Sequence, residues 1–205
     1  MIRAIVLILL AVAALQTLPF SQTEAEWNWT NKHFEAALDS LMPLQRTQGV
    51  YVVYRANRDL YTEVPEYWFL IGYDGNPDGH GLQPTLSAHV RAADSVSIYD
   101  QLMRMHRKEP NEDASSMVRR MKLTNWDTNE TACPAIRKQV QKLQELQSKP
   151  LDLNSEVIVL HPMNHQFHIQ AAGGDMKFTI WDDEQPLVLW AVETRRVLES
   201  CTKVQ

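Results

Sequence analysis

The last quarter of the sequence constrains the fold of this chain more than any other part. Three segments in it, 156–161, 165–171 and 176–181, alternate between apolar and polar residues, which is typical of half-buried strands. Pro162-Met163-Asn164 separates the first two segments. Gly173-Gly174, between the second and the third, is a strong signal for a two-residue hairpin. The sequence therefore predicts a three-stranded antiparallel meander.

One pairing register satisfies both predicted turns. It places His161 opposite His165 and Ile169 opposite Phe178. Because successive side chains of a strand point to opposite faces, this register collects the apolar residues on a single face. That predicted face consists of Val157, Val159, Phe167, Ile169, Ala171, Met176, Phe178 and Ile180.

An amphipathic helix is predicted to follow the meander and cover it. Asp182-Asp183-Glu184 places negative charge at the helix start, where it suits the helix dipole, and Pro186 fits the first turn. Residues at helical spacing then share one face: Leu187, Trp190, Ala191, Thr194, Val197, Leu198 and Cys201.

The rest of the chain alternates between helical and extended patterns. Helices are predicted after Thr30 or Asn31 up to Pro43, from Asp94 or Ser95 to about 108, after Asn111, and from Cys133 onwards. Strands are predicted at 50–55, 60–64, 67–73 and, at a sheet edge, 86–92. Residues 125–131 are predicted to be a polar connection. This order favours an α+β fold. We expect a single domain whose mostly antiparallel sheet has about five or six strands, with helices packed mainly on one face.

The amino-terminal segment has the features of a signal peptide. Arg3 precedes an unbroken apolar run over residues 4–15, which is too short to span a bilayer. Small residues around Ala25 predict cleavage there, so that residues 1–25 form the signal and 26–205 the exported domain. The alternative is an uncleaved amino-terminal anchor. We expect a secreted, periplasmic or otherwise extracytoplasmic protein with no stable membrane span after cleavage.

Charge and cysteine content narrow the class of protein further. The formal net charge is −5, and an acidic exported domain is a poor candidate for nucleic-acid binding. Cys133 and Cys201 are the two cysteines of the sequence, and in an oxidising compartment such a pair predicts a disulfide. The alternative is two buried free thiols.

Two sets of residues are candidate metal ligands, and both sets are incomplete. Asp74, Asn76 and Asp78, followed by Gly79, match the first half of a calcium loop, although Thr85 stands where a bidentate Glu belongs; the alternative is a polar hairpin loop. His161 and His165 form a candidate zinc pair that lacks a third ligand, and the alternative is two histidines that close the end of the core. We therefore expect no cofactor, with calcium or zinc as the alternatives.

No motif in the sequence identifies a function. A nucleophile elbow, a glycine-rich phosphate loop and a haem attachment site are absent from it. Six aromatic residues lie close together in the sequence, and such residues favour binding surfaces when they are exposed: Tyr51, Tyr54, Tyr61, Tyr67, Trp68 and Tyr73. The alternative is that these residues simply pack under the helices. We predict a non-catalytic exported domain that binds another protein or a small ligand, or has a role in the cell envelope. The alternative is a metal-assisted hydrolase that uses His161 and His165.

Overall fold

The computed structural model describes residues 24–45, 49–57, 66–74, 85–94, 96–147, 164–171 and 174–202. The chain divides into two compact units. The first contains Met1–Leu41 and Ile98–Met121, and the second contains Met42–Ser97 and Lys122–Gln205. Within the described ranges, no helix is both long and apolar enough to cross a membrane. The predicted boundary at residue 25 between signal peptide and exported domain stays a prediction.

The first unit is helical. Residues 24–41 form one helix, followed later in the chain by α2 (Ile98–Lys108) and α3 (Ala114–Arg120). The first helix is already formed at Thr30, whose hydroxyl donates to the carbonyl of Glu26, so the predicted cap at Thr30 or Asn31 is wrong. Asp113 caps α3 by accepting a hydrogen bond from the amide of Ser115, in place of the predicted cap at Asn111.

The second unit is built on a six-stranded antiparallel sheet. Its strands are β1 (Val50–Asn57), β2 (Tyr67–Asp74), β3 (Thr85–Ala93), β4 (Leu123–Asn129), β5 (Asn164–Ala171) and β6 (Gly174–Ile180). They lie in the order β4-β3-β2-β1-β5-β6, and every neighbouring pair is antiparallel. The α+β prediction with about six strands is therefore confirmed.

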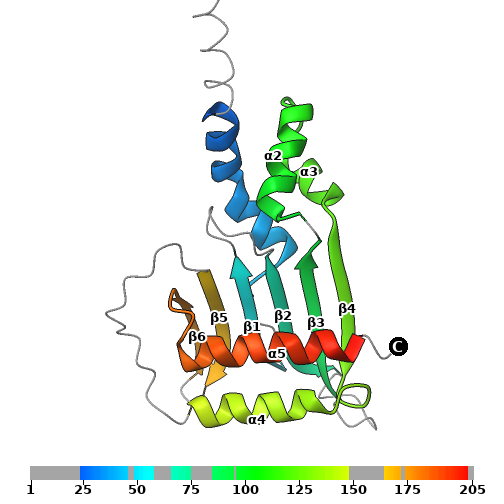
Figure 1. Ribbon diagram of the computed structural model, residues 1–205, viewed down its shortest axis with the longest axis vertical. Coiled ribbons are helices and arrows are strands. Elements are labelled where there is room, and N and C mark those ends of the chain that lie inside the picture. Colours follow the sequence, from blue (N-terminus) through cyan, green and yellow to red (C-terminus); the bar gives the residue numbers. More distant parts are fainter. Residues whose placement is uncertain are drawn as a thin grey trace, which may run out of the picture. The chain divides into compact units, whose positions relative to one another are not determined.

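Helices α4 (Ala135–Gln147) and α5 (Pro186–Thr202) lie side by side across one face of this sheet (Figure 1). The predicted start of α5 is confirmed, because Asp182 accepts a hydrogen bond from the amide of Glu184 and the helix begins at Pro186. Alternate residues of the strands and the inward faces of both helices form the core. Its fully buried members include Val52, Phe69, Ile71, Ala88, Ile136, Phe167, Ile169, Val188, Ala191 and Leu198.

The structure corrects the predicted meander. Strand β5 pairs with β1 along one edge and with β6 along the other, so both of its edges are occupied. Alternation in the sequence identifies a strand but does not choose its partner. Here the partner is β1, whose Tyr54 packs against Phe167 of β5. Residues 156–161 themselves lie outside the described part of the chain.

The predicted hairpin between 165–171 and 176–181 is confirmed as β5 and β6, with a different register. Ile169 pairs with Met176 rather than with Phe178, and Ala171 pairs with Gly174, so the loop comes earlier than predicted. A shift of two residues keeps every side chain on its face. For this reason Phe167, Ile169, Phe178 and Ile180 still belong to the core, although their partners changed.

The predicted edge of the sheet is also wrong. β3 lies inside the sheet between β2 and β4, and the edge is β4, in a stretch predicted to be a polar connection. An edge strand covered on one face needs few apolar residues: in β4 only Thr128 is buried, and Trp126 is half-buried. The predicted strand at 60–64 lies outside the described residues.

Candidate functional site

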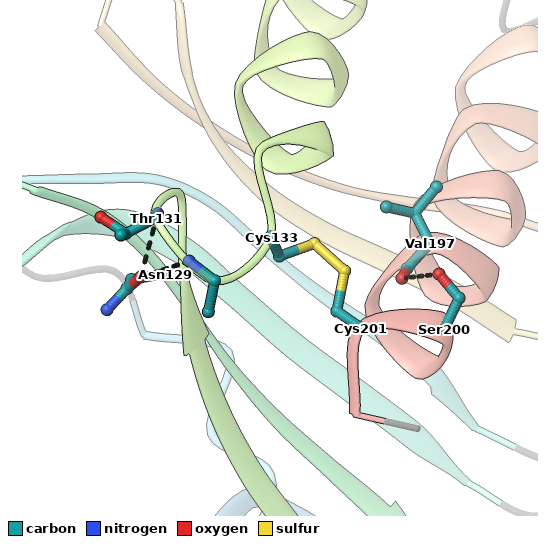
Figure 2. Close-up of a disulfide and its surroundings, with 7 residues drawn as sticks. Asn129, Thr131, Cys133, Val197, Ser200 and Cys201 are labelled. Carbon is teal, nitrogen blue, oxygen red and sulfur yellow. Dashed lines mark hydrogen bonds between the residues drawn. A yellow bond between two sulfur atoms is a disulfide. The ribbon is translucent and has the colours of Figure 1, made fainter. Parts of the chain in front are cut away.

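Cys133 and Cys201 lie at disulfide distance, as predicted (Figure 2). Their sulfur atoms are 1.96 Å apart and their Cα atoms 5.7 Å apart. Cys133 follows a turn in which the side-chain oxygen of Asn129 accepts hydrogen bonds from the amides of Thr131 and Ala132. Cys201 lies in the last turn of α5. The pair thus connects the start of α4 to the end of the chain's last helix.

His165 lies at the start of β5, where it is the centre of a buried polar network. Its Nδ1 is 2.8 Å from the hydroxyl of Tyr54 on β1, and its Nε2 is 2.7 Å from a carboxylate oxygen of Asp183. The side chains of Tyr54 and His165 are buried, whereas the side chain of Asp183 is 58% exposed. The network therefore runs from the protein surface, just before α5, into the core.

The partners of His165 fix the positions of its protons. A carboxylate only accepts, so Nε2 carries the hydrogen that is donated to Asp183, and Nδ1 of the neutral ring accepts from the Tyr54 hydroxyl. Burial lowers the pKa of His165, and the Asp183 carboxylate opposes this effect. Burial raises the pKa of Tyr54 well above its usual range, so its hydroxyl stays protonated and remains a donor. This chain of hydrogen bonds is therefore better suited to stabilising the fold than to transferring a proton.

The predicted metal ligands are not brought together in the described part of the chain. Both ring nitrogens of His165 make hydrogen bonds, so it can ligate a metal only by giving one of them up. His161, Asn76 and Asp78 lie outside the described residues, and for Asp74 only the backbone is described. Among the residues described, no group of three His, Cys, Asp or Glu side chains is placed to hold a metal ion. The calcium and zinc sites stay predictions.

A second polar contact lies beneath α5 on the same face of the sheet. The guanidinium of Arg195 stacks on the ring of Tyr67 at 4.4 Å, and its Nε donates to Glu199 at 2.8 Å. The hydroxyl of Tyr67 is buried and has no hydrogen-bond partner within the described part of the chain. Burial raises the pKa of Tyr67, so the neutral phenol is strongly favoured. Tyr67 therefore contributes packing and a cation–π contact rather than an ionisable group.

The aromatic residues predicted to form a binding surface are mostly inside the second unit. Tyr54, Tyr67 and Trp68 are buried. Tyr51 and Tyr73 are half-buried and pack against each other, with ring centroids 5.5 Å apart. The sixth, Tyr61, lies outside the described residues. The five described rings therefore do not form an exposed aromatic surface.

The sheet face opposite α4 and α5 holds the segment Met42–Leu44. Arg55 Nη1 donates to the carbonyl of Met42 at 3.1 Å, and Trp68 Nε1 donates to that of Pro43 at 2.8 Å. His168 Nδ1 donates to the carbonyl of Leu44 at 3.0 Å. Buried polar side chains of β1, β2 and β5 thus satisfy three successive carbonyls of this segment. Arg55, Trp68 and His168 are thus already hydrogen-bonded within the chain. This leaves less of the sheet face for a partner than the sequence predicted.

A groove between the outer sides of α4 and α5 is the clearest surface for a partner. It has a volume of about 350 Å³ and is lined by Lys142, Glu145, Leu146, Pro186, Leu189, Trp190 and Glu193. Leu189 is 54% exposed, whereas its neighbour Trp190 is 3% exposed and donates its Nε1 hydrogen to the carbonyl of Gln139. We refer to these seven residues as the α4–α5 groove.

Three of the seven residues that line the α4–α5 groove are charged. Lys142 lies 2.6 Å from Glu193 and joins the two helices. This contact holds the pKa of Glu193 below its usual range. Glu145 adds a second carboxylate, so the lining carries one more negative than positive charge.

Comparison with known protein families, curated proteins and solved structures found no match to this chain. Neither the Tyr54–His165 hydrogen bond nor the α4–α5 groove was predicted from the sequence. Leu189 is a large apolar residue outside the predicted inward stripe of its helix, but so is Val188, which is buried, so the pattern alone does not identify Leu189 as exposed. Asp183 belongs to a pair of adjacent acidic residues before a helix, which was a possible signal for a polar site. Helix capping explains such a pair equally well, and Asp182 fills that role.

Proposed function

We propose that this chain is an exported, non-catalytic domain that binds a protein partner through the α4–α5 groove. The observation that carries the proposal is Leu189, a large apolar side chain left 54% exposed in a groove that Leu146, Pro186 and Trp190 also line. Exposed apolar side chains gathered around a concavity are typical of interaction sites. A volume of about 350 Å³ is at the small end of the range for ligand sites.

The charge of the groove favours one kind of partner. Glu145 and Glu193 outnumber Lys142 in the lining. A partner that inserts an aliphatic side chain next to a lysine or arginine therefore fits the groove in both shape and sign. The proposal keeps the predicted binding role and moves it from the sheet to the helices, because Tyr54, Tyr67 and Trp68 are buried.

Export is part of the same proposal. The Cys133–Cys201 pair is at disulfide distance, and disulfides persist mainly in oxidising compartments. The metal-assisted hydrolase is the weaker candidate, since the ring nitrogens of His165 are already bonded to Tyr54 and Asp183. Analysis of protein purified without chelators tests that alternative, and stoichiometric zinc lost on replacing His165 with Gln would favour it over the binding role.

The binding proposal is tested by NMR titration of the full chain with short peptides. One peptide presents a leucine flanked by lysines, and a matched peptide carries glutamates in place of the lysines. We expect the lysine peptide to shift amide signals around the α4–α5 groove and the glutamate peptide to bind more weakly. Leu189→Lys should weaken binding by about tenfold or more, because it removes the apolar contact and adds a like charge.

Trp181→Lys is the control for this variant. Trp181 is 53% exposed, which resembles Leu189, but it does not line the groove. The control should bind the lysine peptide like the unmodified chain. Equal losses in both variants, shifts that map to another surface, or no difference between the two peptides would each rule the proposal out.

A further inference from the structure

Three aromatic rings from two helices of the first unit stack on one another. The indole of Trp29 and the imidazole of His106 have centroids 3.8 Å apart and planes that differ by 1°. The imidazole of His33 stacks on the same indole, with centroids 4.2 Å apart. Trp29 and His33 belong to helix 24–41, and His106 belongs to α2. We refer to these three rings as the Trp29 cluster; it joins the two helices.

A charged contact beside the Trp29 cluster joins the same helices. Arg107 donates from Nε and from Nη2 to one carboxylate oxygen of Glu26, at 2.9 and 2.7 Å. Glu26 is 7% exposed, although it carries a charge. This carboxylate is close enough to His106 to act on its titration. A change in the charge of His106 would therefore change its electrostatic interaction with the Glu26 carboxylate.

The environment of His106 favours its neutral form. Its Nδ1 is buried and has no hydrogen-bond partner among the residues that the structure describes. In the neutral ring that nitrogen can hold a lone pair, whereas protonation would place a charged N–H there with no acceptor. Burial is the main reason why the pKa of His106 is lowered; Glu26 opposes this effect and His33 adds to it.

The proton positions of His33 are set by the helix. Its Nδ1 lies 2.7 Å from the carbonyl oxygen of Trp29, so Nδ1 carries the hydrogen and donates it to that carbonyl. Charged groups of α3 have other partners: Arg119 bonds to Ser116, and Arg120 bonds to Glu109 and Glu112.

We propose that the Trp29 cluster is an acid-sensitive clasp, which holds helix 24–41 against α2 near neutral pH and loosens when the imidazole of His106 takes up a proton. A protonated imidazole can attract an indole face, which would strengthen the stack. At His106 this gain is outweighed, because the new N–H would have no acceptor among the described residues. The clasp would make the helical unit respond to the acidity of its surroundings, independently of the α4–α5 groove.

The direction of the pH effect follows from linkage. The folded-state pKa of His106 lies below its unfolded value of about 6.5, so the unfolded state binds more protons. The contact is therefore fully stable above about pH 6.5 and is lost progressively as the pH falls below that value. Each unit by which the pKa is lowered is worth about tenfold in the opening equilibrium.

The clasp is tested by hydrogen exchange of the full chain at pH 7.5 and pH 5.5, corrected for the intrinsic pH dependence of exchange. We expect the amides of helix 24–41 to lose protection at the lower pH, by about threefold to tenfold. His106→Gln removes the titrating group and should abolish most of this loss. His89→Gln, which changes a histidine of the second unit, is the control and should leave the loss unchanged.

Two results would overturn the clasp. One is an acid-induced loss of protection that is as large in His106→Gln as in the unmodified chain, or no loss at all. The other comes from NMR titration of the His106 ring in the unmodified chain, which stays informative if the variant fails to fold. Proton uptake by that ring at or above about pH 6.5 would contradict the proposal.

Discussion

The hydroxyl of Tyr54 lies 2.8 Å from Nδ1 of His165, although the two residues are 111 positions apart in the sequence. Both side chains are buried between the sheet and its helices. Replacing Tyr54 by Phe would leave Nδ1 without a donor, so we expect the free energy of unfolding to fall by about 1–3 kcal/mol. Urea denaturation of the unmodified chain and of Tyr54→Phe measures this difference.

Tyr67→Phe is the matched control for that loss. Tyr67 is as deeply buried as Tyr54, but its hydroxyl makes no hydrogen bond to any described residue. Removing the hydroxyl should therefore be neutral or stabilise the fold by up to about 1 kcal/mol. If both variants lost the same stability, the Tyr54–His165 bond would not be the cause.

Asp183→Asn tests the other end of the network. The amide oxygen can still accept from Nε2 of His165, but the negative charge that opposes the effect of burial is gone. We expect the pKa of His165 to fall further, as measured by NMR titration of its ring protons. Because the folded pKa is already below the unfolded value, stability is present above about pH 6.5 and is lost as the pH falls. The variant should lose more stability between pH 7.5 and pH 5 than the unmodified chain, and an unchanged or raised pKa of His165 would contradict this assignment.

Reducing the Cys133–Cys201 disulfide should destabilise the second unit. The two residues are 68 positions apart, and closing a loop of this length restricts the unfolded chain by about 4 kcal/mol as an upper figure. We expect the reduced protein, and a double variant with Ala at both positions, to unfold at clearly lower urea concentration. Amides in the last turns of α5 should exchange faster as well. Recovery of both cysteines as free thiols from the oxidised protein would refute the bridge.

Gly72→Ala tests the pairing of β1 with β2. A Cβ at Gly72 would lie 2.8 Å from the carbonyl oxygen of Gly49 and 2.8 Å from Cα of Val50, and neither backbone atom can move cheaply. We expect a loss of about 3 kcal/mol in the free energy of unfolding. Gly174→Ala is the comparison: its Cβ would meet no atom within 4 Å, so it bears only the strain of its positive φ, about 1 kcal/mol. The order of the two losses, measured by urea denaturation, decides whether close backbone packing restricts Gly72.

Local patterns predicted most helices and strands of this protein, but not which strands pair. Pro186 and its acidic neighbours identified the start of α5, and the alternation around Phe167 and Phe178 identified β5 and β6. Any neighbouring strand with an apolar face on the same side would fit the same alternation. The sequence therefore does not reveal that β1, far away in the chain, takes the place beside β5. Strand β4 was missed because Thr128 is its one buried residue, and the half-buried Leu123 and Trp126 stand among polar residues.

Within the candidate sites, covalent chemistry was easier to predict than hydrogen bonding. Two inward-facing cysteines in one sequence leave little choice of partner, and Cys133 and Cys201 do come together. His165 was singled out for a metal because of His161, a near neighbour in the sequence. Its bonds go instead to Tyr54 and Asp183, and the first of these depends on the β1–β5 register.

The position of β1 between β2 and β5 has a consequence for how the protein forms. Synthesis completes β1, β2, β3 and β4 well before β5 emerges, since Tyr54 and His165 are 111 residues apart. Until then β1 is an edge strand with unpaired backbone groups and a row of apolar side chains, which is a template for pairing with other chains. A nascent or truncated chain that ends before β5 is thus an aggregation-prone species, and the final third of the sequence protects the first strand of the sheet.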